Sequence, residues 1–446
     1  MATTTSTVTP EQQERRLPRV RRRPWWRRRP VHRALVVSHR WTSLVLGLVL
    51  IAITTSGAAV LYEPEWQTWA HPALYTATPS DQPMSLGAAY ELVQREHPDF
   101  SPGTVNAFHG IYEVLSTDGE AHPGAWLVDP GRAAVTGFVN PQHGVMGFFV
   151  NLHECALTCG GYTGYVPFLG HEVPGLATLL PGATWGTLIL ALMGVLLVFL
   201  AISGLVLWWP GLKRWSHGFR VRWRQSRYTR DFDLHQLAGL VAVPFLLMWG
   251  ITGSSFELPL DNAWFAVTGA TPTPEDQYDF TSNKPPEGAT DIGLDAAIAA
   301  AARTTSGTPV YASVPSEDGT DGSYGIYLSA GVDPYAYGHY PGQVLVDVDR
   351  YDASHVKQVS EARYSSLSHQ IWDNWRSGLL HYGYAVNGWW RLIWFAFGLA
   401  PLMLAWTGVS TWLYKRGVAR RRAQARRARA ADPTTTEEAN SLIPTP

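Results

Sequence analysis

The chain has 446 residues, of which 46% are hydrophobic and only 16% are charged, a low charged share for a soluble protein of this length. A net charge of −1 conceals two cationic ends, because residues 15–33 hold ten arginines and residues 415–429 hold eight basic residues. With two cysteines, the chain cannot be a disulfide-rich scaffold or hold a four-cysteine zinc or iron–sulfur site. Their spacing also excludes covalently attached c-type haem.

Four segments are apolar and long enough to cross a hydrocarbon core, which needs roughly 20 helical residues. Tryptophan or tyrosine flanks the second and fourth, as expected for rings that prefer the headgroup zone. We therefore expect an integral membrane α-helical protein, with the lipid bilayer as a partner and no nucleic acid. The four expected transmembrane helices are residues 35–61, 185–209, 233–258 and 389–414.

Basic residues predict the orientation. Of the 35 Lys and Arg residues, 26 lie in the first 40 residues, in residues 210–232 or after Tyr414. Because cytoplasmic loops carry an excess of Lys and Arg, we expect a cytoplasmic arm (1–34), a cytoplasmic loop (210–232) and a cytoplasmic tail (415–446). With this orientation, both termini lie on the cytoplasmic side of the plasma membrane. The first apolar segment is too long for the core of a cleaved signal, so it is expected to remain as an anchor.

The two long segments between the helices, 62–184 and 259–388, are expected outside the cell. The outer side as a whole carries 29 acidic and nine basic residues. Each segment has an apolar helical stretch followed by alternating, strand-like runs. We expect one small α+β domain in each segment.

The two halves of the sequence match each other. His39 precedes Gly57 by 18 residues and His235 precedes Gly253 by 18 residues, which is five helical turns. The second and fourth apolar segments match likewise, since 19 residues separate a tryptophan from a glycine in the pairs Trp185–Gly204 and Trp389–Gly408. The sequence thus predicts a two-fold internal repeat of helix, outer domain, helix.

Histidines at the helix ends are the candidate site residues. His39 and His235 lie at matching cytoplasmic ends, whereas His153 and His381 lie on the outer side. Two imidazoles at one depth can ligate haem iron from both faces, and this leaves no open position, so such a haem transfers electrons. We expect two b-type haems, one near each face. Zinc fits less well, because no third ligand is evident at either depth.

The outer ligand loop leaves alternatives open. His171 lies closer than His153 to the second apolar segment and could replace it as ligand, and His143 is a third possibility. Cys155 and Cys159 follow His153 on the oxidising side of the membrane, so we expect a disulfide that rigidifies this loop.

Several stretches together resemble the PepSY-associated transmembrane helix family, over most of residues 35–415. They include Ser-His-Arg-Trp from Ser38, Asn-Leu-His from Asn151, Asp-Leu-His-Gln-Leu-Ala-Gly from Asp233 and Asp-Asn-Trp-Arg from Asp373. Residues 127–138, with an Asp-Pro-Gly turn, are similar to a PepSY strand motif. The resemblance implies a four-helix core, b-type haem on helix-end histidines, extracytoplasmic PepSY domains and ferric siderophore reduction. About 30 residues separate His153 from the second helix, an insertion relative to the other half.

The expected function is transmembrane electron transfer to an outer acceptor, with a ferric chelate such as a ferric siderophore as the favoured one. No Gly-x-Gly-x-x-Gly fingerprint occurs, and the 23-residue inner loop is too short for a nucleotide fold, so the donor must be a separate cytoplasmic reductase or membrane quinol. The alternative is a non-redox receptor or regulator whose PepSY domains bind peptides, proteases or metal. A solute permease is a weaker reading, because no polar stripe appears in the helices.

Overall fold

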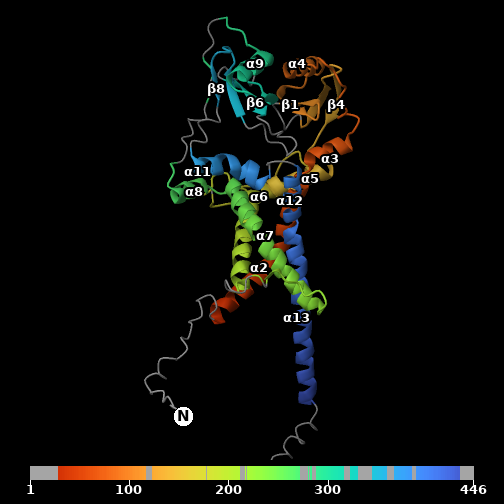
Figure 1. Cartoon of the computed structure of the whole chain (residues 1–446), viewed down its shortest axis with the longest axis vertical. Coiled ribbons are helices and arrows are strands. Elements are labelled where there is room, and N and C mark those ends of the chain that lie inside the picture. Colours follow the sequence, from red (N-terminus) through yellow and green to blue (C-terminus); the bar gives the residue numbers. More distant parts are fainter. Residues whose placement is uncertain are drawn as a thin grey trace, which may run out of the picture.

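The structure is a computed structural model with an eight-stranded sheet at one end and four long helices below it (Figure 1). Parts of the expected arm, loop and tail (1–28, 211–215 and 432–446) lie outside the described residues. The structure describes residues 29–431, except for 117–122, 177, 211–215, 217, 272–279, 281, 284–287, 316–321, 330–343, 359–365 and 384–387.

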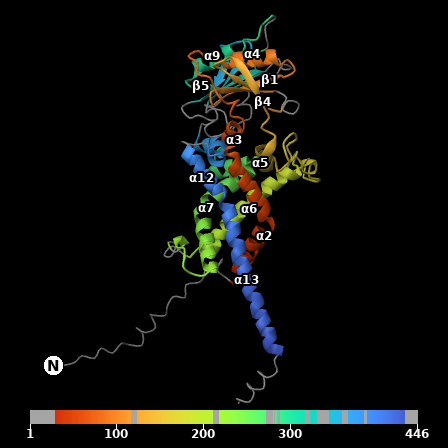
Figure 2. The same cartoon turned by 90° about the vertical axis from the view of Figure 1, so that its right-hand side faces the viewer.

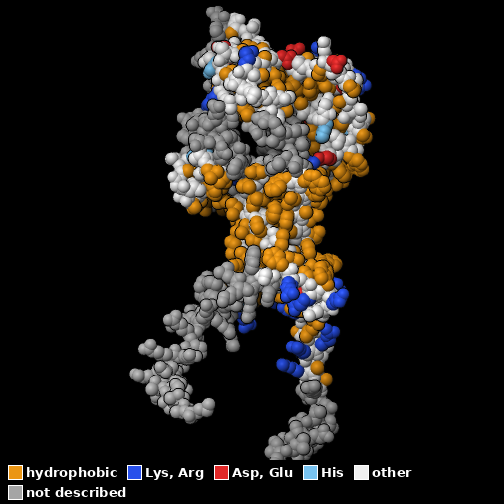
Figure 3. Space-filling model, in the orientation of Figure 1, with side chains coloured by type: hydrophobic (Ala, Val, Ile, Leu, Met, Phe, Trp, Pro, Cys, Tyr) orange, Lys and Arg blue, Asp and Glu red, His pale blue; other side chains and the backbone are white. Residues whose placement is uncertain are grey.

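Four helical segments are long and apolar enough to cross a membrane. They are α2 (Arg29–Val60), α6 (Trp185–Trp208), α7 (Arg227–Glu257) and the consecutive helices α12 (Gly388–Gly398) and α13 (Ala400–Ala431). The last pair is interrupted at Leu399, two residues before Pro401, which has no N–H for a helical hydrogen bond. Apolar side chains cover the outside of this bundle (Figure 3). Leu48, for example, is 78% exposed. Such a surface belongs in lipid, and the protein is a membrane protein.

One antiparallel sheet combines strands from both long connecting segments. Its order is β4-β3-β2-β1-β5-β6-β7-β8, and β1 pairs with β5 through Thr104↔Ser313, Val105↔Ala312 and Asn106↔Tyr311. The segments expected to form separate units therefore share one sheet. The strands are β1 (Pro102–Phe108), β2 (Ile111–Ser116), β3 (Ala125–Asp129), β4 (Ala134–Val139), β5 (Thr308–Ser313), β6 (Ser323–Ser329), β7 (Val344–Asp349) and β8 (Val356–Gln358).

Two helices, α4 (Leu86–Glu96) and α9 (Leu294–Thr304), pack on the face of the sheet that points away from the long helices (Figures 1 and 2). Alternate strand residues fill this core, and the side chains of Val105, Ile326 and Val346 are completely buried in it. Period-two alternation along the strands provides one apolar face. The helices of the two halves also meet, since Ser85 at the start of α4 donates a hydrogen bond to Asp295 of α9.

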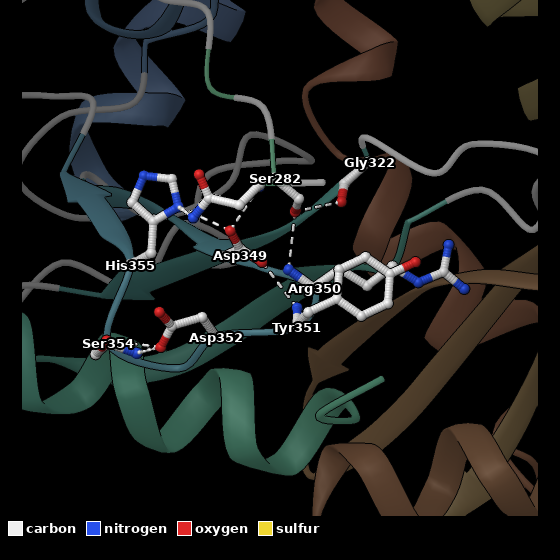
Figure 4. Close-up of polar contacts among 9 residues, drawn as sticks. Ser282, Gly322, Asp349, Arg350, Tyr351, Asp352, Ser354 and His355 are labelled. Atoms are coloured by element: carbon white, nitrogen blue, oxygen red, sulfur yellow. Dashed lines mark hydrogen bonds and ion pairs between the residues drawn. The ribbon is translucent and has the colours of Figure 1, made fainter. Parts of the chain in front are cut away.

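A buried aspartate ends the third strand of each half-sheet and ties a preceding segment to it. Asp129 accepts hydrogen bonds from the backbone and hydroxyl of Thr78 and from Arg132. Asp349 accepts hydrogen bonds from the backbone of Asn283 and from His355 (Figure 4). The two aspartates therefore have equivalent roles, with a guanidinium beside one and an imidazole beside the other.

Short elements join the sheet to the long helices. They are α3 (Glu63–Ala70), α5 (Gly144–Cys155), η2 (Pro167–Gly170), α8 (Asp261–Thr268), α11 (Leu367–His369) and the π-helix η6 (Gln370–His381). In Figure 1, α5 and η6 lie between the sheet and the bundle. This position brings their side chains against the sheet-side ends of α2 and α7.

Candidate functional site: two histidine pairs in the bundle

The sheet-side pair consists of His153, on the last turns of α5, and His381, the last residue of η6. Their rings face each other with centroids 6.1 Å apart and planes 28° apart. Metal–imidazole bonds of about 2.0–2.1 Å on opposite sides of one ion place two ring centroids roughly 6 Å apart. The centroid distance of the sheet-side pair therefore matches the distance between two imidazoles on one metal ion.

The basic-end pair consists of His39 on α2 and His235 on α7, near the opposite end of the bundle. His153 contacts α2 at Ile53 and Gly57, so the two pairs lie roughly 25 Å apart along this helix, at 1.5 Å rise per residue. No ring contact joins His39 to His235 among the aromatic contacts of the described residues. The basic-end rings therefore lack the direct ring contact that joins His153 to His381.

Hydrogen bonds fix the sheet-side rings. His153 Nδ1 lies 2.8 Å from the carbonyl oxygen of Ile53 on α2, and His381 Nδ1 lies 2.9 Å from Thr252 Oγ1 on α7. A carbonyl can only accept, so His153 must donate from Nδ1. The Thr252 hydroxyl donates its own proton to the carbonyl of Met248, and so it accepts from His381.

Hydrogen bonds fix the basic-end rings in the same way. His235 Nδ1 lies 3.0 Å from both the Leu404 carbonyl and Thr407 Oγ1 of α13. His39 Nδ1 lies 2.8 Å from Ser203 Oγ of α6, whose hydroxyl reaches the carbonyl of Leu200. A hydrogen bond to a neighbouring helix therefore fixes the orientation of each ring.

The consequence is one tautomer for all four imidazoles, with the proton on Nδ1 and the lone pair on Nε2. Within the described part of the chain, Nε2 of none of the four makes a hydrogen bond. Metal-bound histidines usually have this arrangement, because the bond at the second nitrogen fixes the ring orientation and raises the basicity of the ligand.

A glycine on a neighbouring helix lies against each ring. A Cβ added at Gly57 would lie 2.3 Å from His153 Cε1, and one at Gly253 would lie 3.3 Å from His381 Cε1. At the basic end, a Cβ at Gly204 would lie 3.4 Å from His39 and one at Gly408 would lie 3.5 Å from His235. The sequence identified these glycines by spacing but did not show that each supports the ring of a different element.

His171 and His143 occupy different surroundings from His153. Both are exposed, and His171 contacts the ring of Phe168 at a centroid distance of 6.1 Å. Neither has a ring contact to His381 among the described residues. The structure thus brings His153 to His381 and leaves the two alternatives outside the pair.

A disulfide joins Cys155 and Cys159 at the end of α5. The Asn151 side chain accepts a hydrogen bond from the Cys159 N–H, and Ala156 has a left-handed backbone with φ 48°. The chain therefore reverses sharply three residues after His153. This closed turn ends the helix that presents His153.

Arginines border the sheet-side pair, and only Arg376 belongs to one of the sequence motifs. Arg376 on η6 donates to the carbonyl and hydroxyl of Ser255 on α7. Arg391 on α12 donates to the carbonyl of Leu61 and forms an ion pair with Glu65. Both cations cross-link elements around the sheet-side end of the bundle.

Each pair would supply a metal with two protein ligands. Among the described residues, no group of three or more His, Cys, Asp or Glu side chains could hold a metal ion together. Two axial imidazoles are a complete protein ligand set for a haem, whose macrocycle supplies the other donors. The residues present fit that group, on the evidence of ring spacing, tautomer and glycine contacts.

Comparison with known proteins supports the family. No curated protein matches the sequence. The family model for the PepSY-associated TM region matches residues 37–415, which include the sheet, α6, α7 and α12, most of α2 and the first half of α13. The chain therefore belongs to the PepSY-associated transmembrane family.

Proposed function

We propose that the protein is a di-haem transmembrane electron-transfer protein that reduces an extracytoplasmic ferric chelate such as a ferric siderophore. The geometry of the sheet-side pair carries the proposal: two imidazoles 6.1 Å apart, with Nδ1 of each already bonded. Family membership supports a membrane role in electron transfer or in a PepSY-associated process.

The haems proposed are b-type, one at each histidine pair. His153 and His381 would hold one, and His39 and His235 the other. When bound, haem supplies a one-electron Fe(III)/Fe(II) couple. The chain itself orients the imidazoles through Nδ1, keeps Nε2 available and leaves space for the rings with glycine.

The orientation proposed puts the sheet outside the plasma membrane and both termini in the cytoplasm. Basic side chains gather on the end of the bundle opposite the sheet, and acidic side chains appear on the sheet end (Figure 3). This asymmetry follows the excess of Lys and Arg found on cytoplasmic loops. A cytoplasmic reductase or membrane quinol would then donate electrons near the basic-end pair.

The test is the visible spectrum of the purified protein, followed by redox titration and a pyridine haemochrome assay. We expect a Soret band, two haems per chain and six-coordinate, low-spin iron. Protein purified with haem available during expression but lacking a Soret band would reject the proposal and favour the non-redox PepSY receptor.

A further inference from the structure

A pocket of about 620 Å³ opens at the sheet-side end of the bundle, beside the sheet-side histidine pair. Its walls are residues 179–183 before α6, Thr187 on α6, residues 255–259 and Asp261 at the junction of α7 and α8, and Trp372 and Arg376 on η6. This volume lies within the range of pockets that bind small molecules, about 300–1,000 Å³. The pocket is therefore large enough for a small chelate.

Phe256 connects this pocket to the histidine pair. Its ring lines the pocket and also packs edge-on against His381, with ring centroids 5.1 Å apart. Gly253, three residues earlier on α7, also lies against the His381 ring. A molecule in the pocket is thus separated from the ligand imidazole by one aromatic ring.

Polar groups in the pocket define the charge of its occupant. Glu257 and Asp261 are the anionic side chains in its lining, and Arg376 is the cationic one. The Arg376 guanidinium hydrogen-bonds Ser255 and packs 5.3 Å from the Phe256 ring and 5.1 Å from the Trp372 ring. Together with the acidic excess expected on the outer side, the lining favours an uncharged or cationic occupant over a polyanion.

We propose that this pocket is the docking site of the electron acceptor, and that it selects an uncharged or cationic ferric chelate. The inference rests on the proposed function, which supplies the reductant: a ferrous haem at the sheet-side pair. One electron passes to the chelated Fe(III), which becomes Fe(II), while the haem iron becomes Fe(III). No bond to the protein forms or breaks.

Ala183→Trp tests the site, because a new indole would fill the pocket from the wall that faces α7. Val267→Trp is the matched control, since Val267 on α8 is 86% exposed and outside the pocket lining. The full-length protein would be reduced with dithionite, freed of excess reductant and mixed anaerobically with the cationic ferric complex of desferrioxamine B. Haem reoxidation is followed by stopped-flow absorbance, and binding of the gallium complex of the same chelator by calorimetry.

We expect Ala183→Trp to slow reoxidation at least tenfold and to abolish gallium-complex binding, with haem content and midpoint potentials unchanged, while Val267→Trp behaves as wild type. Wild-type kinetics and binding in Ala183→Trp would overturn the docking site and leave the proposed function standing. Loss of the sheet-side haem from that variant would assign the pocket to the haem and also overturn the proposal. Failure of every ferric chelate to reoxidise the wild type would instead refute the proposed function.

The charge selection has its own variant, which fills no space. Glu257→Gln with Asp261→Asn should lower the ratio of rates for the cationic ferrioxamine complex over anionic ferric citrate by about tenfold or more. An unchanged ratio, with both rates measurable, would overturn the charge selection.

Discussion

The two halves of the chain build the same site from different supports. Each half supplies one histidine to each pair, and each histidine packs against a glycine. In the N-terminal half, His153 bonds a backbone carbonyl and lies so close to α2 that a Cβ on Gly57 would come within 2.3 Å. In the C-terminal half, His381 bonds the side chain of Thr252, and a Cβ on Gly253 would lie 3.3 Å from the His381 ring. Equivalent positions therefore differ in which substitution they tolerate.

The largest expected effect comes from the ligands themselves, where the halves should be equal. His153→Ala and His381→Ala should each remove the sheet-side haem and leave about half of the total haem. His39→Ala and His235→Ala should each remove the other one. Haem per chain from pyridine haemochrome spectra measures this. His171→Ala and His143→Ala are the controls, and loss of the sheet-side haem in either would contradict the pairing.

Glycine substitutions should separate the halves. Gly57→Ala forces the His153 ring to move, because real Cβ contacts do not come near 2.3 Å, whereas Gly253→Ala needs only a few tenths of an ångström. Overpacking of this kind costs about 1–3 kcal/mol. We expect Gly57→Ala to lose most of the sheet-side haem and Gly253→Ala to retain it. Equal haem retention and equal low-spin electron paramagnetic resonance spectra in the two variants would show that the closer approach at Gly57 does not affect haem binding.

Removal of a hydroxyl should affect His381 in the C-terminal half more than His153 in the N-terminal half. Thr252→Val deletes the acceptor of His381, while Ser56→Ala at the matching position leaves His153 bonded to the Ile53 carbonyl. Loss of a partner of a metal-bound histidine typically costs 10–100-fold in affinity. We expect Thr252→Val to weaken haem retention by about tenfold and to shift the midpoint potential of the sheet-side haem. Ser56→Ala should change neither, and an equal shift in both would be inconsistent with the assigned hydrogen bonds.

The last prediction concerns the acid stability of the sheet and not haem binding. Burial favours the neutral form of Asp129, but hydrogen bonds from Thr78, Arg132 and Gly131 outweigh it and lower the pKa of Asp129 to about 2. A carboxylate whose pKa is lower in the folded state stabilises the fold at any pH above its pKa in the unfolded chain. This contribution is lost as the pH falls through its pKa in the folded protein. Asp129→Asn should cost about 2 kcal/mol at neutral pH, the scale of a charged hydrogen bond.

This difference from the wild type should shrink between about pH 4 and pH 2, because the wild-type carboxylate is protonated there. Thermal unfolding of the detergent-purified protein, followed over this pH range, measures it. Asp81→Asn, at an exposed position of the same half, serves as a control with little effect at neutral pH. A constant difference at every pH would refute the role of the Asp129 charge.

Sequence patterns predicted the four long helices, because hydropathy is a local property. Haem ligation by the histidines stays a prediction, although the 18-residue spacing that singled out two of them is also a local property. His39, His153, His235 and His381 were all named, and the structure places the last residue of η6 opposite α5. Other features depend on long-range contacts. Neither the π-helical geometry of η6 nor the acceptors Ser203 and Thr407 could be read without knowing which helices are neighbours.

The shared sheet was also beyond sequence reasoning. Strand alternation shows which residues face a core, but it does not identify the partner strand, and the β1–β5 pairing follows from no motif. The insertion before α6 cast doubt on His153, yet the structure positions His153 through α5 and its contact with α2 rather than through its distance from α6.

The β1–β5 pairing has a consequence for the biogenesis of the protein. Thr104 of β1 pairs with Ser313 of β5, 209 positions later, and α6 and α7 lie between them. At synthesis rates of about 5–20 residues per second, β1 waits roughly 10–40 s for its partner. During that interval β1 is an open strand edge, which favours wrong pairing with other chains. Synthesis and insertion of α6 and α7 therefore set the time at which β1 becomes safe from aggregation.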